Sequence, residues 1–290
     1  MKNRFLLLML LSAIFAPQVF AWGPTGHRVV AEVAQRHLTP TAREQITQLL
    51  GGHTLAEVVN WPDELRSERR FDKYKPLHFA TVPNGKKSYR DTTPNPCGDL
   101  VTAIDALTAY LTTGSHDDLF KVKALTDKSD GNDKNGCNRE QTEPITRETA
   151  LRMLVHFMGD LHQPLHVGGA DLGGNVVKVS WMGRWQTNLH SVWDDDMVDF
   201  ERLSYTEYAS YLDHVSEEDV TRWQAGDTIA WADEAVAMRP ALYVFPDDKK
   251  PPVVPHLVSY GYTAAQRDRM REQLLKGGLR LASVLNKIFK

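Results

Sequence analysis

The stretch TRETALRMLVHFMGDLHQPLH, residues 146–166, combines the pattern of a buried helix with polar residues that can bind a metal ion. His156 and Asp160 are four residues apart, so they lie on one helical face about a turn from each other. Pro164 ends the helix, and the turn after it brings His166 near the same place. Taken alone, this polar group fits a metal site and a solvated polar face equally well. The apolar positions predict a helix over 146–163 with a core-facing stripe: Leu151, Leu154, Val155, Met158 and Leu161.

Three other segments add histidines and aspartates. Asp63 follows a proline in NWPDELR, residues 60–66, and His78 lies in KPLHF, residues 75–79. His190 and Asp194 are again four apart in LHSVWD, residues 189–194. Carboxylate oxygens and imidazole nitrogens without thiolates suit zinc or a similar divalent ion. Any one of these histidines is more often structural, but the whole set favours a metal centre.

The first 21 residues have the pattern of a secretory signal peptide. Lys2 and Arg4 precede an apolar run over residues 5–16, and small residues lead up to Ala21. The run is shorter than the roughly 20 residues that span a bilayer. Cleavage after Ala21 would leave Trp22 with a free α-amine, whose pKa near 8 lets a metal displace its proton. The sequence therefore predicts a secreted or periplasmic protein with no membrane span and one domain over 22–290.

Composition excludes two other classes of protein. The formal net charge is −3, and it falls to −5 when Lys2 and Arg4 leave with the signal peptide, which is unlike a basic nucleic-acid-binding module. The two cysteines, Cys97 and Cys137, include no CxxC pair, which excludes a zinc ribbon. In an oxidising compartment they are expected to form one disulfide, the alternative being two free thiols.

The rest of the chain is predicted to be mostly helical. A β-hairpin is expected over 174–188 with its turn at Met182-Gly183, and polar loops over 83–98 and 126–145. We find no repeat or linker, so a single mainly α domain is predicted. Further helices are expected over 28–38, from Pro40 to Gly51-Gly52, and over 99–112, 218–240 and 263–289.

Five motifs together resemble the S-one/P-one family of single-strand-specific zinc nucleases, part of the phospholipase C/nuclease superfamily. They follow one another from Trp22 to Asp194: Trp22-Gly23 with His27, WPD at Asp63, HF at His78, HFMGDLHQPLH, and LHSVWD. The resemblance implies a mainly α, bundle-like single-domain fold with a small β-hairpin, shared with bacterial phospholipase C. It also implies three Zn²⁺ ions in a cleft.

The resemblance also implies which residues bind each ion. The first zinc would take Asp63, His78, His156 and Asp160. A close neighbour would take the Trp22 amine and carbonyl, His27 and the other oxygen of Asp160. The third would take His166, His190 and Asp194.

Catalytic and substrate-binding roles follow from the same resemblance. Asp160 would orient the nucleophile, and Arg66 would bind phosphoryl oxygens, its alternative being an ordinary surface arginine. Phe79 would stack on a base, its alternative being core packing, and Asn175 would bind a base edge. The fungal pattern has an acidic residue shortly after the HF pair, where this chain reads Ala80-Thr81-Val82, and the base preference is correspondingly open. His162 is expected to lie outside the metal ligands.

The predicted function is a zinc-dependent endonuclease that hydrolyses single-stranded DNA and RNA to 5′-phosphorylated products. The resemblance also implies a 3′-nucleotidase activity on nucleotides. It implies no stable protein partner. One alternative is a phospholipase C acting on lipid phosphodiesters, against which the WPD-x-x-R arrangement argues. Another is a non-catalytic zinc-binding protein, which would need coordinatively closed sites, whereas three ligands for the third ion leave a position open.

Overall fold

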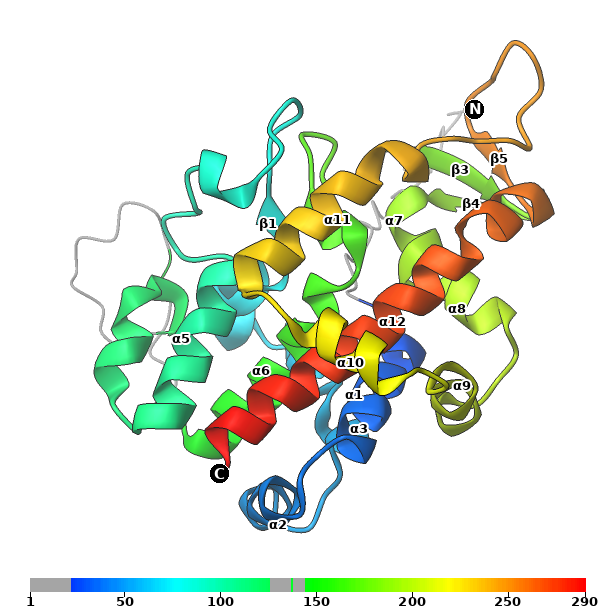
Figure 1. Cartoon of the computed structure of the whole chain (residues 1–290). Coiled ribbons are helices and arrows are strands. Elements are labelled where there is room, and N and C mark those ends of the chain that lie inside the picture. Colours follow the sequence, from blue (N-terminus) through cyan, green and yellow to red (C-terminus); the bar gives the residue numbers. More distant parts are fainter. Residues whose placement is uncertain (1–21, 126–136, 138–143) are drawn as a thin grey trace, which may run out of the picture.

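The chain is described by a computed structural model, which covers residues 22–125, 137 and 144–290. Five long helices form its frame (Figure 1). One of these helices, α6, lies in the middle and contacts each of the other four. The frame consists of α1 (Pro24–Arg36), α5 (Leu100–Thr113), α6 (Arg147–Leu161), α11 (Thr228–Leu242) and α12 (Tyr260–Ile288).

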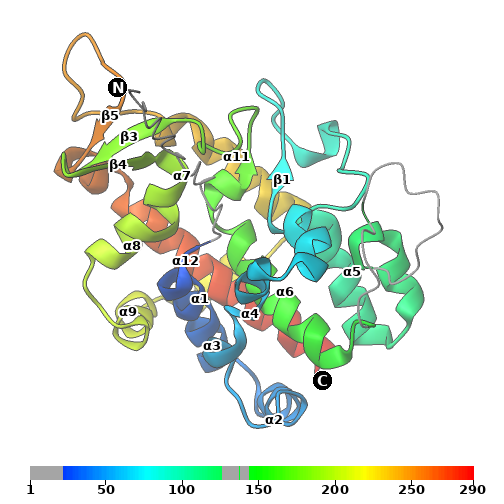
Figure 2. The same ribbon diagram turned by 180° about the vertical axis from the view of Figure 1, so that it is seen from behind.

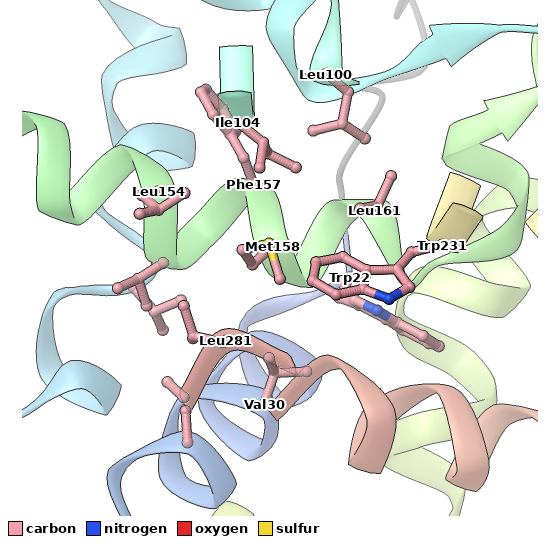
Figure 3. Packing of buried hydrophobic residues seen from close by; sticks show 14 of the residues in the cluster. Trp22, Val30, Leu100, Ile104, Leu154, Phe157, Met158, Leu161, Trp231 and Leu281 are labelled. Carbon is pink, nitrogen blue, oxygen red and sulfur yellow. The ribbon is translucent and has the colours of Figure 1, made fainter. Parts of the chain in front are cut away.

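Helix α6 is buried on all sides from Met153 to its C-terminal end. Its apolar side chains pack against α5 on one side, through Leu100 and Ile104, and against Val30 and Leu281 on the other (Figure 3). His156 and Asp160 on the same helix are fully buried as well. The predicted core stripe is therefore correct, but the polar face is enclosed too. Buried polar groups of this kind must be satisfied by hydrogen bonds or by a bound ion.

Shorter elements surround the frame. Figure 2 shows the strands β3 (Lys178–Trp181), β4 (Trp185–Asn188) and β5 (His256–Val258) gathered with the short helices α7 and α8 toward one end of the molecule. The helices are α2 (Pro40–Leu49), α3 (Leu55–Val58), α4 (Trp61–Glu64), α7 (Leu189–Ser191), α8 (Met197–Phe200), α9 (Tyr205–Leu212) and α10 (Glu217–Gln224). The 3-10 segments include η1 (Leu65–Ser67), η2 (Arg69–His78), η3 (Tyr89–Asp91) and η6 (Pro164–His166), and η7 (Val192–Asp196) is a π-helical turn.

Two small sheets are present in the described part of the chain. Strand β1 (Ala80–Thr81) pairs in parallel with β2 (Val167–Gly168). The predicted hairpin is confirmed as β3 (Lys178–Trp181) and β4 (Trp185–Asn188), with left-handed φ values of 52° at Met182 and 68° at Gly183. Strand β5 (His256–Val258) adds to β3 in parallel, a distant pairing that sequence pattern does not reveal.

Most predicted helices are confirmed, with one correction. The helix expected over 218–240 is two helices, α10 and α11. Gly226 between them has φ of 97°, and the Asp227 side chain accepts a hydrogen bond from the Ala230 N–H to begin α11. The predicted loop over 83–98 contains only the short η3, while most of 126–145 lies outside the described residues.

The disulfide prediction is confirmed, since Cys97 and Cys137 are bonded with their Cα atoms 5.2 Å apart. No helix in the described part of the chain has both the length and the apolar character needed to cross a bilayer.

Candidate metal centre

Histidine and aspartate side chains from six segments meet at the C-terminal end of α6. Their donor atoms form three groups, within each of which all lie within 4.8 Å of one another. His156 belongs to two of the groups, so those two lie side by side. The groups are His27 with Asp63 and His156, His78 with His156 and Asp160, and His166 with His190 and Asp194.

The surrounding elements explain why these residues meet. The pairing of β1 with β2 sets Ala80 opposite Val167, which brings the preceding residues, Phe79 and His166, to the same edge. His27 lies in the first turn of α1, and its ring stacks on that of His156 at 3.9 Å between centroids. Residues 189–196 carry the third group through a helical and then a π-helical turn. Segments distant in sequence therefore converge on a single helix end.

Backbone carbonyls orient three of the histidines. Nδ1 donates to Val59 O at 2.7 Å in His156, to His78 O at 2.6 Å in His166, and to Gly173 O at 2.7 Å in His190. A ring that donates from Nδ1 has its lone pair on Nε2, which is the form that binds a metal. All three Nε2 atoms face the groups described above.

The third group fits a cation especially well. Nε2 of His166 and Nε2 of His190 are 3.1 Å apart, although each ring already donates from Nδ1. Two lone pairs that face each other repel unless a positive charge lies between them. Asp194 Oδ2 lies 3.4 Å from Nε2 of His190 and adds a carboxylate to this pair. Nitrogen and oxygen donors in this arrangement suit zinc.

Asp160 joins the other two groups. Its Oδ1 lies 3.4 Å from Nε2 of His27, and its Oδ2 lies 3.1 Å from Nδ1 of His78 and 3.4 Å from Nε2 of His156. The side chain is fully buried. A carboxylate so far from water is costly unless cations lie beside it. The two oxygens point to different histidines, as a carboxylate bridging two ions would.

Gln163 is a functional candidate that sequence reasoning missed. Its Nε2 donates to Asp194 Oδ1 at 2.6 Å, and its Oε1 accepts from the Leu165 N–H at 2.7 Å. Burial raises the pKa of Asp194 well above its usual range, while His190 and Gln163 act to lower it. Gln163 therefore leaves Asp194 Oδ2 directed at the histidines. The sequence feature that could have indicated Gln163 is its position between two candidate metal ligands, Asp160 and His166.

The remaining predicted residues are placed as follows. Trp22 is buried, and the next residue, Gly23, donates its N–H to the Asp194 carbonyl at 2.8 Å. The backbone of Arg66 lies in η1, and its side chain lies outside the described part. Phe79 is 39% exposed, which contradicts the core-packing alternative. Asn175 donates from Nδ2 to Leu172 O at 2.8 Å within a turn.

His162 points away from the centre. Its Nδ1 donates to Met158 O at 2.8 Å, and its Nε2 accepts from Arg280 at 3.1 Å. Burial, reinforced by the charge of Arg280, lowers the pKa of His162 to about 3. His162 is therefore a neutral core residue between α6 and α12.

Gly159 makes room for His27, which leads to a first prediction. A Cβ at residue 159 would lie 2.6 Å from Nδ1 of His27. Gly159→Ala should improve helix propensity by about 1 kcal/mol, yet we expect it to displace His27 and lower the metal content. Bound metal per chain, measured by plasma mass spectrometry, checks this.

Two further variants serve as the comparison for Gly159→Ala: His27→Ala alone, and the double variant Gly159→Ala/His27→Ala. If the glycine acts by making room for His27, the double variant will have the metal content of His27→Ala, because the two changes then remove one interaction. Unchanged metal content in Gly159→Ala would contradict the prediction.

The sequence of the chain is similar to those of a family of known nucleases. A sequence profile of the family described as S1/P1 Nuclease matches residues 22–290. Endonuclease 3 of Arabidopsis thaliana is 31% identical, covering 92% of this chain and 89% of the relative. Nuclease P1 of Penicillium citrinum is 28% identical over 92% and 97%, and Nuclease S1 of Aspergillus oryzae is 27% identical over 75% and 69%.

Proposed function

The chain belongs to the S1/P1 nuclease family, and from this premise we propose that it is a secreted zinc-dependent endonuclease that cleaves single-stranded DNA and RNA to 5′-phosphorylated products. That it is a nuclease, and so a phosphodiester hydrolase, follows from the family itself. The finer proposal is supported above all by the facing Nε2 atoms of His166 and His190, 3.1 Å apart beside a buried carboxylate. We include removal of 3′-phosphate from nucleotides in the proposal.

We assign three zinc ions to these donors, and we divide the two adjoining groups by the oxygen of Asp160 that each histidine faces. Asp63, His78, His156 and Asp160 would hold the first, and Asp160, His27 and the backbone of Trp22 the second. His166, His190 and Asp194 would hold the third. When bound, such ions lower the pKa of water toward 7 and stabilise negative charge on a phosphodiester.

The side chains around the ions would supply orientation and contacts. Asp160, which presents one oxygen to His27 and the other to His78 and His156, would accept a hydrogen bond from the attacking water and fix its direction. Arg66 would donate hydrogen bonds to phosphoryl oxygens. The cationic centre would hold the substrate locally, although the whole chain has a formal charge of −3.

Substrate recognition is assigned to residues beside the third group. Phe79 is exposed directly after His78, so its ring can stack on a base, a contact worth about 1–3 kcal/mol. Stacking tolerates any base, in keeping with a nuclease of broad specificity. Asn175 uses its Nδ2 to hold the turn at Leu172, so we assign its Oδ1 to the base edge.

Trp22 gives a second prediction. We propose that residues 1–21 are removed as a signal peptide and that the Trp22 amine and carbonyl bind one zinc. A protein that keeps one extra alanine before Trp22 should hold one zinc fewer per chain, because its terminal amine is displaced from the ion. Metal analysis alongside N-terminal sequencing checks this. Equal zinc content in the two forms would contradict it.

The function is tested with one labelled oligonucleotide, offered as a single strand and as a duplex. We expect the single strand to be cleaved much faster, leaving 5′-phosphate and 3′-hydroxyl ends that mass spectrometry identifies. Cleavage of both forms at one rate, or 3′-phosphate products, would contradict the proposal. A parallel assay with 3′-AMP tests the nucleotidase activity separately.

A further inference from the structure

A groove lies beside the metal centre, outside the residues assigned to it. It has a volume of about 640 Å³ and runs between the loops after β1 and β2, with α11 along its side. Both views place these two loops next to α11 (Figures 1 and 2). Gly169 lines the groove and is three residues past His166, so at about 3.3–3.6 Å per residue the groove begins within roughly 10 Å of the third donor group.

The groove carries positive charge. Lys86, Lys87 and Arg239 line it, against the single carboxylate of Asp171. Both lysines are exposed, and neither has an ion pair with any residue in the described ranges. The Asp171 carboxylate accepts hydrogen bonds from the Tyr243 hydroxyl at 2.6 Å and from the Gly174 N–H at 3.1 Å. The lysine charges are therefore available to an anionic ligand.

The segment that carries the lysines is held at both ends. Lys86 N–H donates to Pro83 O at 3.0 Å, and Gly85 has φ of 88°, which together form a turn that favours glycine at its third position. On the other side, Ser88 Oγ and the Tyr89 N–H each donate to Asp233 of α11 at 2.7 Å. The lysines thus start from a fixed segment, which lowers the entropy lost on binding.

Hydrogen bonds also hold the base of the groove in place. Arg239 is 9% exposed, and its Nη1 donates to Val82 O at 2.7 Å and to Val167 O at 3.3 Å. It therefore ties α11 to the two strands that place Phe79 and His166. The side-chain oxygen Oδ1 of Asn84 lies directly against Gly169, where a Cβ would collide with it. The groove and the metal centre share these two strands, so their relative position is fixed.

The opposite wall is partly apolar. This wall faces the lysine segment across the groove. It consists of Val236 and Pro240 of α11 and of Tyr243, the residue directly after α11. A ligand with a phosphate on one side and a sugar or base on the other matches this pair of walls. An inorganic anion would use only the charged one. The volume is also within the range of about 300–1,000 Å³ typical of ligand sites.

We propose that this groove binds the backbone of a single-stranded polynucleotide next to the bond being cleaved, with Lys86 and Lys87 contacting phosphates. The inference rests on the nuclease function proposed above and extends it to nucleotides beyond the scissile phosphate. Substrates long enough to reach the groove gain affinity from it, whereas a dinucleotide or a mononucleotide does not.

The test is the double variant Lys86→Gln/Lys87→Gln, assayed with a single-stranded 20-mer, a dinucleotide and 3′-AMP at several salt concentrations. We expect KM for the 20-mer to rise about tenfold near 0.1 M salt, because each phosphate contact contributes about 0.7 to the dependence of log affinity on log salt. In a plot of log kcat/KM against log salt concentration for the 20-mer, the slope should become shallower by about 1.4, the sum for two phosphate contacts. KM and kcat/KM for the dinucleotide and for 3′-AMP should stay unchanged.

The matched control is Lys249→Gln/Lys250→Gln, which removes the same charge from another exposed lysine pair, outside the groove. It should leave KM for the 20-mer unchanged. An equal loss in both double variants would assign the effect to overall charge and overturn the proposal, as would unchanged KM in the groove variant. A wild-type protein that cleaves none of the three substrates would instead contradict the proposed function itself.

Discussion

Asp160→Asn is expected to reduce nuclease activity by at least about 10³-fold, the largest effect of any single substitution in this chain. The carboxylate is fully buried and presents Oδ1 to His27 and Oδ2 to His78 and His156. Asparagine has nearly the same shape, but it lacks the negative charge and turns an NH₂ group toward one set of donors. Two adjacent ions would lose a shared ligand at once.

The measurement pairs activity on single-stranded DNA with metal content per chain. Asp213→Asn is the control, because its carboxylate also binds a histidine, His37, with Oδ1 and Nε2 2.8 Å apart, in a half-buried pair at the other end of α1 from His27. We expect the control to keep both its metal and its activity. If Asp160→Asn retained full metal content and activity, Asp160 would not be a bridging ligand.

Chelation gives the second large effect, on stability as well as on activity. Removing the proposed ions would leave the buried carboxylates of Asp160 and Asp194 among histidines, two of which have Nε2 lone pairs that face each other. A ligand present at a hundred times its Kd stabilises the folded state by about 2.7 kcal/mol. For a chain of this size that corresponds to roughly 5–10 °C in Tm for each ion. Activity should vanish in parallel.

Zinc titrated back into the chelated protein tests this by differential scanning fluorimetry. The Tm should rise with zinc concentration, and activity should return with it. Magnesium at the same concentrations should restore neither, because it prefers oxygen ligands and this donor set is rich in imidazole. Recovery with magnesium alone, or a Tm indifferent to chelation, would contradict a zinc centre.

Local pattern was enough for much of the fold. The apolar spacing in 146–166 and the proline at 164 predicted α6 and its end to within two residues, and Met182-Gly183 predicted the hairpin turn. The sequence-based prediction was wrong or incomplete in two places, one at a break within a helix and one at a strand pairing between distant segments. The apolar pattern of 218–240 ran through Gly226 and concealed the division between α10 and α11. Strand β5 pairs with β3, whose residues come 77 positions earlier in the chain.

Most of the candidate metal ligands could be singled out by residue type and spacing, whereas His27 and the division of the ligands among ions were implied by the family resemblance. His156 with Asp160, and His190 with Asp194, are each one helical turn apart, so local geometry alone sets them on one face. Gln163 was not predictable in this way. An amide becomes important only through what it touches, and its hydrogen bond to Asp194 joins residues 31 positions apart.

By itself, then, the sequence determined the helical class, the family and the kinds of atoms that meet at the centre. Helical spacing and residue chemistry act over a few positions, and a linear chain displays both. Three features came from the packing of the whole chain: the hydrogen bonds from Nδ1 of three histidines to backbone carbonyls, the burial of α6 on all sides from Met153 onward, and the groove that Lys86 and Lys87 line beside the centre. These features depend on contacts between segments far apart in the chain, and such contacts form only when the whole fold packs.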